Sequence, residues 1–280
     1  MEQMESKRHI VSFTLFPSIK RNGGDSMIDM HSHILWNVDD GPKSLEESIE
    51  MLQQAMKEGI TDIISTSHSQ HPQYDVPFNI VNEQIRILQQ ELTSRNIPLM
   101  IHSGHEVRLN EKLISLIQEG QIHKLAQSSY LLLELPSSHV PNYTKNIIHA
   151  LAIEGITPII AHPERNKGIA EKPERLERLI REGALAQITA GSLAGHFGKS
   201  VQKLSLDLVR ANLVHTYGSD VHNLTTRPFL FEEGLTFLEK KKELDLVDVL
   251  LQNNRNIITN EPFVILEPET LKKRKWWNLV

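Results

Sequence analysis

Short apolar runs alternate with amphipathic runs along most of this chain, beginning near Met27. One amphipathic run begins at Ser44, which forms a capping box with Glu47, and its apolar residues keep helical spacing up to Gly59. Further helices are predicted at 79–95, 111–119, 143–154, 173–182 and 200–211, with Gly155 and Gly183 as caps at two C-terminal ends. Each predicted helix is followed by a short apolar strand, so strand and helix alternate regularly.

Seven strands are predicted, and six of them end in a histidine or a carboxylate. Six strands lie at 28–30, 60–66, 98–102, 131–133, 157–161 and 213–217, and the seventh follows Gly183. The polar residues that follow them are His31, His33, Asp40, His68, Glu106, Glu134, His162, Asp220 and His222. Regular alternation predicts a parallel sheet, either a barrel or a doubly wound sheet. Polar residues after six different strands favour a seven-stranded, distorted barrel, because all its strands end at one mouth.

The residue types at these strand ends indicate a metal site. Alternate side chains of a strand point to opposite faces, so His31 and His33 point the same way, as do Asp220 and His222. Imidazoles and carboxylates without thiols are the ligands of borderline or hard divalent metals. Several such ligands at one end of a sheet predict a multinuclear site and a metal-dependent hydrolase.

Composition narrows the class of protein. The chain has 280 residues, 39% of them hydrophobic, and no apolar run long enough to cross a bilayer, so we expect a globular protein of the cytoplasm. A net charge of −5 argues against a nucleic-acid partner, which would require a basic face. Cysteine is absent, which excludes disulfides, thiolate zinc sites and a cysteine nucleophile.

Several polar positions leave alternatives open. Asp39 and Asp40 precede a Gly-Pro pair, and either one can be an Asx-turn residue without metal contact. Glu134 ends a strand that should be buried, so its carboxylate needs either a metal or an arginine as partner. Arg165 and Arg227 lie in loops after strands, where a guanidinium is either solvated or bound to phosphate oxygens through paired hydrogen bonds.

Nine other histidines carry no metal assignment. Those expected in the N-terminal extension, in helices or within a strand are interpreted as structural or solvated (His9, His123, His149, His215). Those that flank Glu106 either orient this ligand or belong to the core and surface (His102, His105). Those in loops either touch substrate or are solvated (His71, His139, His196).

Both ends of the chain are set apart from this pattern. Residues 1–26 are expected to be a leader or a disordered extension, and Met27 is a candidate start, because a ribosome-binding sequence could encode the residues before it. Residues 27–262 are expected to form one catalytic domain. Residues 263–280 form a basic and aromatic tail that includes Lys272–Trp277, interpreted either as solvated or as a weak contact to a membrane or a membrane-bound kinase.

The polar motifs together resemble a known family. They are H-S-H (31–33), D-D-G (39–41), T-S-H (66–68), G-H-E (104–106), L-L-E-L-P (132–136), A-H-P-E-R (161–165) and G-S-D-V-H-N (218–223). This set resembles the PHP superfamily, named for polymerase and histidinol phosphatase domains. Within it, the set resembles most the manganese-dependent tyrosine-protein phosphatases of Gram-positive bacteria, the CpsB/YwqE type. The segment ITAGSLAGHFGK (188–199) supports this subfamily, and the likeness covers about residues 27–260.

The resemblance implies a distorted (β/α)7 barrel of the PHP type with a three-metal centre at the carboxyl ends of the strands. It assigns the first metal to His31, His33, Glu106 and Asp220, the second to Glu106, Glu134 and His162, and the third to Asp40, His68 and His222. Glu134 stands where the superfamily more often has histidine, which favours Mn²⁺, with two to three ions in all and Fe, Co or Zn as other candidates. Arg165 and Arg227 match the positions that hold the phosphate and are assigned as catalytic.

The activity that the resemblance implies is hydrolysis of phosphotyrosine by a metal-activated water. The expected partner is a cognate bacterial tyrosine kinase, or its substrates, in capsule or exopolysaccharide synthesis. The enzymatic alternative is a phosphoesterase that acts on a small metabolite such as histidinol phosphate. An alternative of another class is a metal-stabilised regulatory module that binds a kinase without catalysis.

Overall fold

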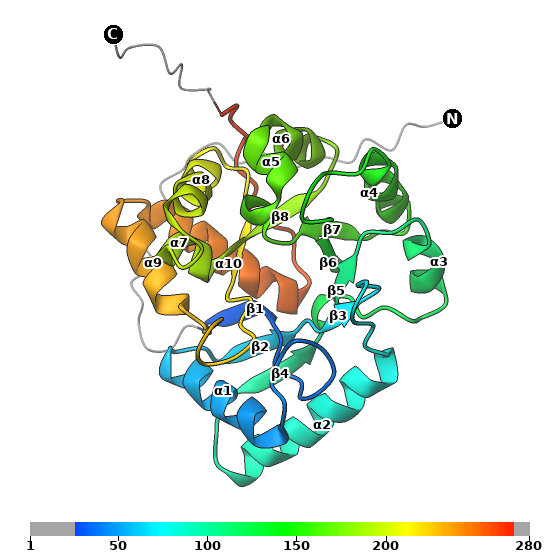
Figure 1. The fold of residues 1–280 in the computed structure, drawn as a ribbon, viewed down its shortest axis with the longest axis vertical. Helices are drawn as coiled ribbons and strands as arrows, with labels where there is room; N and C mark the ends of the chain where they lie inside the picture. Colours follow the sequence, from blue (N-terminus) through cyan, green and yellow to red (C-terminus); the bar gives the residue numbers. More distant parts are fainter. Residues whose placement is uncertain (1–25, 272–280) are drawn as a thin grey trace.

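A computed structural model describes residues 26–271, which form an α/β fold of parallel strands with helices outside them (Figure 1). The strands are β1 (Ile28–Ser32), β2 (Asp62–Ser65), β3 (His68–Ser69), β4 (Met100–Ser103), β5 (Glu106–Arg108), β6 (Tyr130–Glu134), β7 (Thr157–Ile160), β8 (Leu185–Thr189) and β9 (Thr216–Gly218). The helices are α1 (Leu45–Lys57), α2 (Phe78–Ser94), α3 (Leu113–Gln118), α4 (Thr144–Ile153), α5 (Lys167–Glu171), α6 (Glu174–Arg181), α7 (Ala190–Ala194), α8 (Lys199–Arg210), α9 (Phe231–Lys240) and α10 (Leu244–Thr259). Short 3₁₀ turns lie at η1 (Leu125–Gln127) and η2 (Pro163–Arg165).

The strands form a curled parallel sheet. One set has the order β1-β2-β4 and the other β3-β5-β6-β7-β8-β9, and every strand pair is parallel. Only two residues separate β2 from β3 and β4 from β5, so the two sets continue into one another. At the far edges, Ser32 of β1 forms a parallel bridge with Val221, just after β9. The Asp220 N–H donates to the His31 carbonyl oxygen at 2.8 Å beside this bridge.

Glycine at 218 is required by this close approach of β1 and β9. A Cβ atom at Gly218 would lie 2.7 Å from the Cβ of His31, nearer than two carbon atoms can pack. The chain therefore brings the histidine strand against the last strand only because a residue without a side chain stands there.

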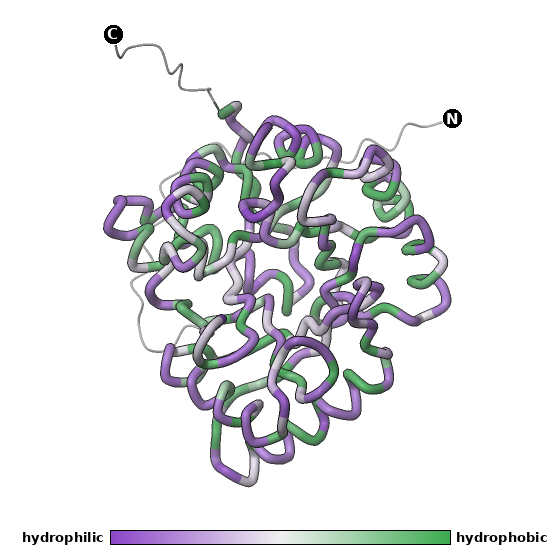
Figure 2. Tube along the Cα trace, viewed as in Figure 1, coloured by the Kyte–Doolittle hydropathy of each residue, from purple (hydrophilic) through white to green (hydrophobic). Residues whose placement is uncertain are grey.

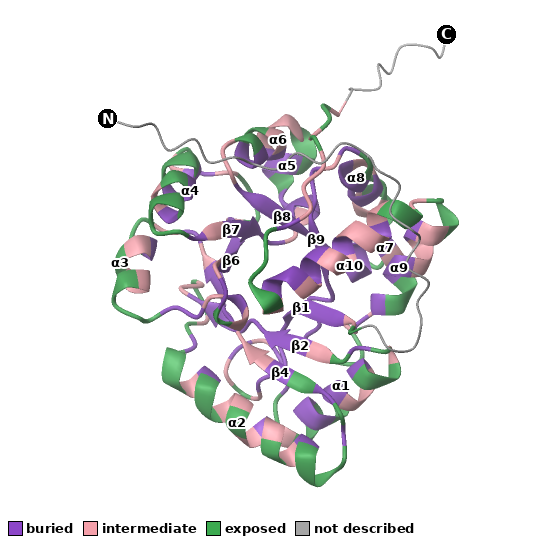
Figure 3. Ribbon diagram, turned by 180° about the vertical axis from the view of Figure 1, so that it is seen from behind, coloured by how far each residue is buried: buried purple, intermediate pink, exposed green. Residues whose placement is uncertain are grey.

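Apolar side chains cover both faces of the strands. Along β6, Leu131 and Leu133 join a large cluster with the outer helices, whereas Leu132 between them joins a smaller cluster with α10. This alternation is the period of two that a strand imposes on its side chains. Hydropathy along the chain and burial both show the result, with the strands apolar and buried and the outer sides of the helices polar and exposed (Figures 2 and 3).

Helix α10 lies against the beginning of β1 and against β9. The Asn254 amide donates to the carbonyl oxygens of Ile28 and Tyr217, at 2.8 and 2.6 Å. Beyond this helix, residues 262–271 have neither helix nor strand but pack on the body. Phe263 is buried there against Tyr130, with ring centroids 4.4 Å apart.

The predicted pattern of strand and helix is confirmed for most of the chain. All six predicted helices exist, with ends within a few residues of the expected bounds. The prediction did not include α5, α7, α9 or α10, and the strand expected at 213–217 is β9, which begins only at Thr216. The capping box is half confirmed: Ser44 accepts from the Glu47 N–H at 3.2 Å, but the Glu47 carboxylate accepts from the Lys43 N–H.

Two expectations concern membranes and the chain ends. Within residues 26–271, no helix has both the length and the apolar character needed to cross a membrane. The predicted leader, apart from Ser26, and the Lys272–Trp277 segment lie outside the described residues.

Candidate metal centre

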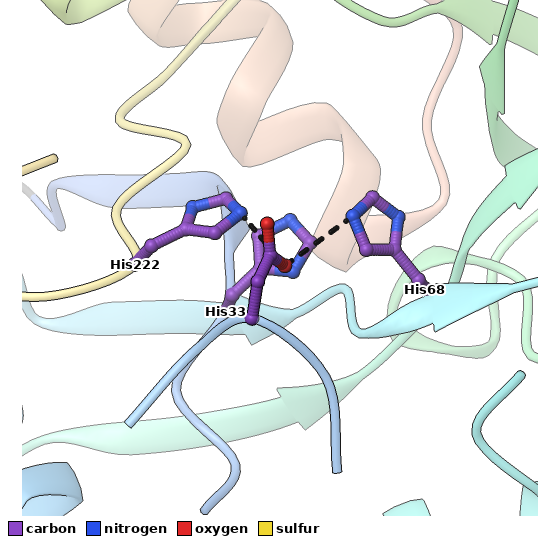
Figure 4. A group of neighbouring side chains, drawn as sticks. His33, His68 and His222 are labelled. Atoms are coloured by element: carbon purple, nitrogen blue, oxygen red, sulfur yellow. Dashed lines mark ion pairs between the residues drawn. The ribbon is translucent and has the colours of Figure 1, made fainter. Parts of the chain in front are cut away.

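The nine residues predicted as metal ligands come together at one end of the sheet. They form three groups, and in each group the ligand atoms lie within 4.8 Å of one another. We name them the His31 group (His31, His33, Glu106, Asp220), the His68 group (His33, Asp40, His68, His222) and the Glu134 group (Glu106, Glu134, His162). His33 belongs to two groups, whereas the resemblance to the PHP superfamily implied only one. Figure 4 shows the rings of His33, His68 and His222 converging around one carboxylate, that of Asp40.

Protein oxygens fix three of the imidazoles through Nδ1. His31 Nδ1 lies 3.2 Å from Gln187 Oε1, His33 Nδ1 3.1 Å from Asp39 Oδ2, and His222 Nδ1 3.0 Å from the Asp220 carbonyl oxygen. These oxygens only accept, so in the neutral ring Nδ1 carries the hydrogen and Nε2 has the lone pair. The three Nε2 atoms are buried and make no aligned hydrogen bond within the described residues, and a carboxylate oxygen lies 3.2 to 3.4 Å from each of them. Oriented, unpartnered imidazole lone pairs are what a metal ligand requires.

Asp39 and Asp40 have different positions. Asp39 Oδ2 accepts from His33 Nδ1 and from the His68 N–H, and Asp39 Oδ1 accepts from the Gly41 N–H at 3.0 Å, as in an Asx turn. Burial alone would raise the pKa of Asp39, but its hydrogen bond from His33 and the positive charge of His33 lower it to about 2. Asp40 instead faces the His68 group, with its Oδ1 3.2 Å from His222 Nε2. Asp39 therefore orients a histidine, and Asp40 is the carboxylate available to an ion.

Glu106 lies at the centre of the site. Its Oε2 is 3.4 Å from His33 Nε2 and 3.2 Å from His68 Nδ1, and its Oε1 is 2.7 Å from His162 Nε2. Burial would raise the pKa of Glu106, but the surrounding imidazoles outweigh burial and hold this pKa well below its usual range. Burial also lowers the pKa of His33, yet its bond to Asp39 and the nearby carboxylates raise it well above its ordinary value. Without an ion, protonated imidazole balances this negative charge.

Of the two partners that the sequence left open for Glu134, the arginine is observed, and the carboxylate is also placed to serve as a metal ligand. Its Oε2 forms an ion pair with Arg108 at 2.9 Å, and its carboxylate also lies in ligand distance of Glu106 and His162. Burial and the charge of Glu106 raise the pKa of Glu134. The Glu134 group therefore has a cation beside it already.

Arg165 and Arg227 both bind Asp220 rather than solvent. Arg227 Nη2 lies 2.7 Å from Asp220 Oδ2, and Arg165 Nη2 contacts the same oxygen. Burial would raise the pKa of Asp220, but the two guanidinium charges hold it well below its usual range. The guanidinium of Arg165 also lies over the ring of Phe197, 5.0 Å from its centroid. Two cations thus stand at the rim of the metal-ligand groups.

Sequence reasoning did not identify several residues that support the site. Gln187 on β8 contacts His31 and also accepts from the His162 N–H at 3.1 Å. Gln187 is a buried polar residue in the predicted strand that no metal ligand follows, and this signal could have identified it. The segment at 188–199 supplies Phe197, and its Ser192 donates to Glu164 at 2.6 Å, next to Arg165.

The other histidines lie mostly outside the site. His102 pairs with Asp62 at the surface, and His105 is buried and accepts from the His123 N–H. His102 therefore belongs to the surface and His105 to the core, which is one of the two alternatives left open for them. His123 is in a loop before η1 rather than in a helix, because its ring stacks on Phe78. His71 lies at the site, where it lines the cavity.

A cavity of about 310 Å³ opens above the three groups. Its floor contains Asp40, His68, Glu106, Glu134, His162 and Asp220, and its walls contain His71, Gln73, Tyr74, Leu135, Ser137, Ala161, Arg165, Asn166 and Arg227. Acidic and imidazole groups at the floor with guanidinium groups at the rim suit a divalent metal centre that binds an oxyanion.

Comparison with known sequences identifies the family of the chain. The sequence profile of a family described as capsular polysaccharide synthesis, CpsB/CapC, matches residues 27–260. The chain belongs to this family. Among other CpsB/CapC proteins, it is similar to a putative tyrosine-protein phosphatase CapC of Staphylococcus aureus, with 39% identity over 255 residues, 91% of this chain and 100% of the relative. It is also similar to tyrosine-protein phosphatase YwqE of Bacillus subtilis, with 39% identity over 89% of this chain and 98% of YwqE.

A solved structure has the same fold as this CpsB/CapC chain. It is described as YwqE from Bacillus subtilis and CpsB from Streptococcus pneumoniae, unique metal-dependent tyrosine phosphatases. The TM-score is 0.86 at 39% identity, and the match covers 88% of this chain and 100% of the solved one.

Proposed function

We propose that this chain is a metal-dependent protein-tyrosine phosphatase of the CpsB/CapC family. The observation that carries the proposal is the meeting of three metal-ligand groups and two arginines in one cavity. Relatives of the chain are named as tyrosine-protein phosphatases, and a similar solved structure is described as metal-dependent. The geometry of the site supports metal-dependent chemistry, and the names of the relatives support phosphotyrosine as the class of substrate.

We infer that the curled sheet closes into the distorted (β/α)7 barrel of the PHP type. Counting β2 with β3 and β4 with β5 as bent single strands gives seven strands, with α10 beyond the last of them. The bridge from Ser32 to Val221 supports closure between the first strand and the last. The ligands then lie at the carboxyl ends of the strands, the end at which barrel enzymes place their active sites.

Three divalent ions fit the groups on the chemistry of their donors. Four carboxylates converge there with buried imidazole nitrogens, and the negative charge of this donor set needs cations for balance. The mixture of nitrogen and oxygen donors without sulfur suits Mn²⁺, and also Fe, Co or Zn. Ions held there would neutralise phosphate charge and lower the pKa of an attacking water.

The chain's own side chains supply the rest of the chemistry. Arg165 and Arg227 each use one nitrogen on Asp220, and Arg227 Nη1 also lies 3.5 Å from Asp40 Oδ2. Their remaining N–H groups are placed to hold the non-bridging phosphate oxygens. Because the chain has no cysteine, the thiolate route of other tyrosine phosphatases is closed, and hydrolysis is direct. Tyrosinate, with a parent pKa near ~10, needs little help to leave.

The natural partner we propose is a phosphotyrosine-bearing bacterial tyrosine kinase or its substrates. The family description places the chain in capsular polysaccharide synthesis, which is consistent with such a kinase. A cytoplasmic location, the division at residue 262 and a tail contact to a membrane stay predictions.

The test is hydrolysis by the Mn²⁺-loaded protein of a phosphotyrosine peptide against histidinol phosphate. We expect a strong preference for the peptide, and its loss in His162→Ala, which removes one ligand of the Glu134 group. His149→Ala, at an exposed position on α4 outside the three groups and the cavity, is the matched control. Preference for histidinol phosphate would instead place the same site on a small metabolite. No turnover of either, with a kinase still bound, would indicate a regulatory module.

A further inference from the structure

Three stacked rings stand in one wall of the cavity, beside the His68 group. The rings of His68, His71 and Tyr74 are nearly parallel, with interplanar angles of 21° for His68–His71, 16° for His71–Tyr74 and 8° for His68–Tyr74. Their centroids are 4.6, 5.6 and 5.8 Å apart in the same order. We name these three rings the aromatic shelf.

The loop between β3 and α2 holds the shelf in place. The Val76 N–H donates to the His68 carbonyl oxygen at 2.9 Å, and Asp75 accepts from the Gln70 N–H at 2.8 Å. The Gln73 N–H donates to His71 Nδ1 at 3.3 Å, which fixes the plane of that ring. The His71 ring is therefore oriented before a ligand arrives, and Tyr74 stacks on it, which reduces the entropy lost on binding.

The shelf also faces the reacting end of the cavity. Tyr74 and His71 are half-buried and line the cavity that contains Arg165 and Arg227. His68 joins the shelf to the metal-ligand groups, since its ring belongs to both. A ligand with a phosphate at the arginines can thus lay the group attached to that phosphate along the shelf.

We propose that Tyr74 and His71 bind the phenyl ring of the substrate and so select aryl over alkyl phosphomonoesters. This inference rests on the proposed phosphatase function and names the residues that determine its specificity. A planar ring stacks on the shelf with an offset, whereas an alkyl chain offers no matching face. A phenyl ring also brings large contact area with few rotatable bonds to immobilise.

The experiment measures the binding of phenylphosphonate and methylphosphonate to the Mn²⁺-loaded protein by calorimetry. Both ligands carry the same charged head, so the ratio of their affinities isolates the ring. We expect Tyr74→Leu to lower the preference for phenylphosphonate about fivefold to tenfold. Tyr74→Phe keeps the ring and should keep the preference. Phe78→Leu removes an exposed ring that stacks on His123 outside the cavity, and serves as the matched control.

A second variant, His71→Leu, should lower the same ratio and guards against a folding defect in the first. An unchanged ratio in both Leu variants overturns the proposal. Equal weakening of the two ligands also overturns it, because the shelf would then act only through His68 and the ions. If the wild-type protein shows the shelf-dependent preference but hydrolyses no phosphotyrosine peptide, the proposed function fails while the aromatic site stands.

Discussion

The His68 group and the Glu134 group share one cavity but differ in how far the protein satisfies them. In the His68 group, Asp40 Oδ1 lies 3.2 Å from His222 Nε2 and 3.5 Å from His68 Nε2, and Asp40 Oδ2 lies 3.5 Å from Arg227 Nη1. In the Glu134 group, Arg108 pairs with Glu134 at 2.9 Å and His162 bonds to Glu106 at 2.7 Å. An ion at the first group replaces longer contacts, whereas an ion at the second must displace shorter ones.

This difference predicts that the three groups fill in order rather than together. An ion at the His68 or His31 group replaces imidazole–carboxylate contacts of 3.2 Å or more, so it should bind tightly. At Asp220 the two arginines bind Oδ2, and Oδ1 faces His31 and His33. An ion at the Glu134 group competes with the Arg108 guanidinium for Glu134 and with the hydrogen bond between Glu106 and His162. We therefore expect the Glu134 group to bind its ion most weakly.

The largest expected effect comes from comparing Glu106, a ligand of two groups, with Glu134, a ligand of one. Glu106 belongs to the His31 and Glu134 groups, whereas Glu134 belongs only to its own. Glu106→Gln should lower kcat/KM for a phosphotyrosine peptide on the order of 10³-fold and remove bound metal. Glu134→Gln makes the same chemical change and should cost only on the order of 10-fold to 10²-fold. Equal losses in the two variants, measured with metal content by mass spectrometry, would contradict the difference between the groups.

The next effect tests the rim rather than the ligands. Arg165→Lys keeps the charge but loses the planar fork, so kcat/KM should fall on the order of 10²-fold while metal content stays unchanged. Arg181→Lys, in an exposed ion pair with Glu177, is the control and should leave kcat/KM unchanged. A full rate in Arg165→Lys would show that the ions alone hold the phosphate.

A smaller effect comes from the residue that orients His33. Asp39→Asn removes the charge that accepts from His33 Nδ1, and should weaken Mn²⁺ binding about tenfold. The loss should appear at the His31 and His68 groups, which share His33, and not at the Glu134 group. Asp245→Asn, exposed in the first turn of α10, is the control. Calorimetric titration with Mn²⁺ measures this, and an unchanged affinity for all ions would refute the role of Asp39.

The smallest effect is in the stability of the metal-free protein. Burial lowers the pKa of His33 and of His31, but nearby carboxylates raise both above their ordinary value. The stabilisation that such histidines contribute is complete below pH ~6.5 and is lost as pH rises through the raised value. Burial lowers the pKa of His68 to about 4, so His68 makes the free energy of unfolding rise with pH, but only below pH ~6.5.

We therefore expect metal-free protein to lose on the order of 1 kcal/mol of unfolding free energy between pH 7 and pH 9. Urea unfolding across this range measures the change. Mn²⁺ should abolish the slope, because a ligating imidazole is already neutral. A metal-free stability that rises with pH in this window would show that His31 and His33 are neutral without an ion.

The sequence was sufficient to predict the strand ends but not the contacts between them. His31, His33 and Glu106 follow apolar runs, and a period of two places such residues at one edge of a sheet. The sharing of His33 by two groups depends on the bend between β2 and β3, and no local pattern encodes that bend. Gln187 and Arg108 likewise act on ligands far away in sequence, at His31 and Glu134. Helices α9 and α10 were not predicted because α9 contains Gly234 and α10 buries Asn253, Asn254 and Asn256, which weakens the apolar period of both.

The most direct test removes the metal and restores it. The protein is stripped with a chelator and titrated with Mn²⁺, while bound metal and phosphate release from a phosphotyrosine peptide are followed together. We predict that the stripped protein does not hydrolyse the peptide and that ions bind first, and tightly, at the His31 and His68 groups. Full activity should appear only when the most weakly bound ion occupies the Glu134 group. Full activity in the stripped protein would contradict this prediction.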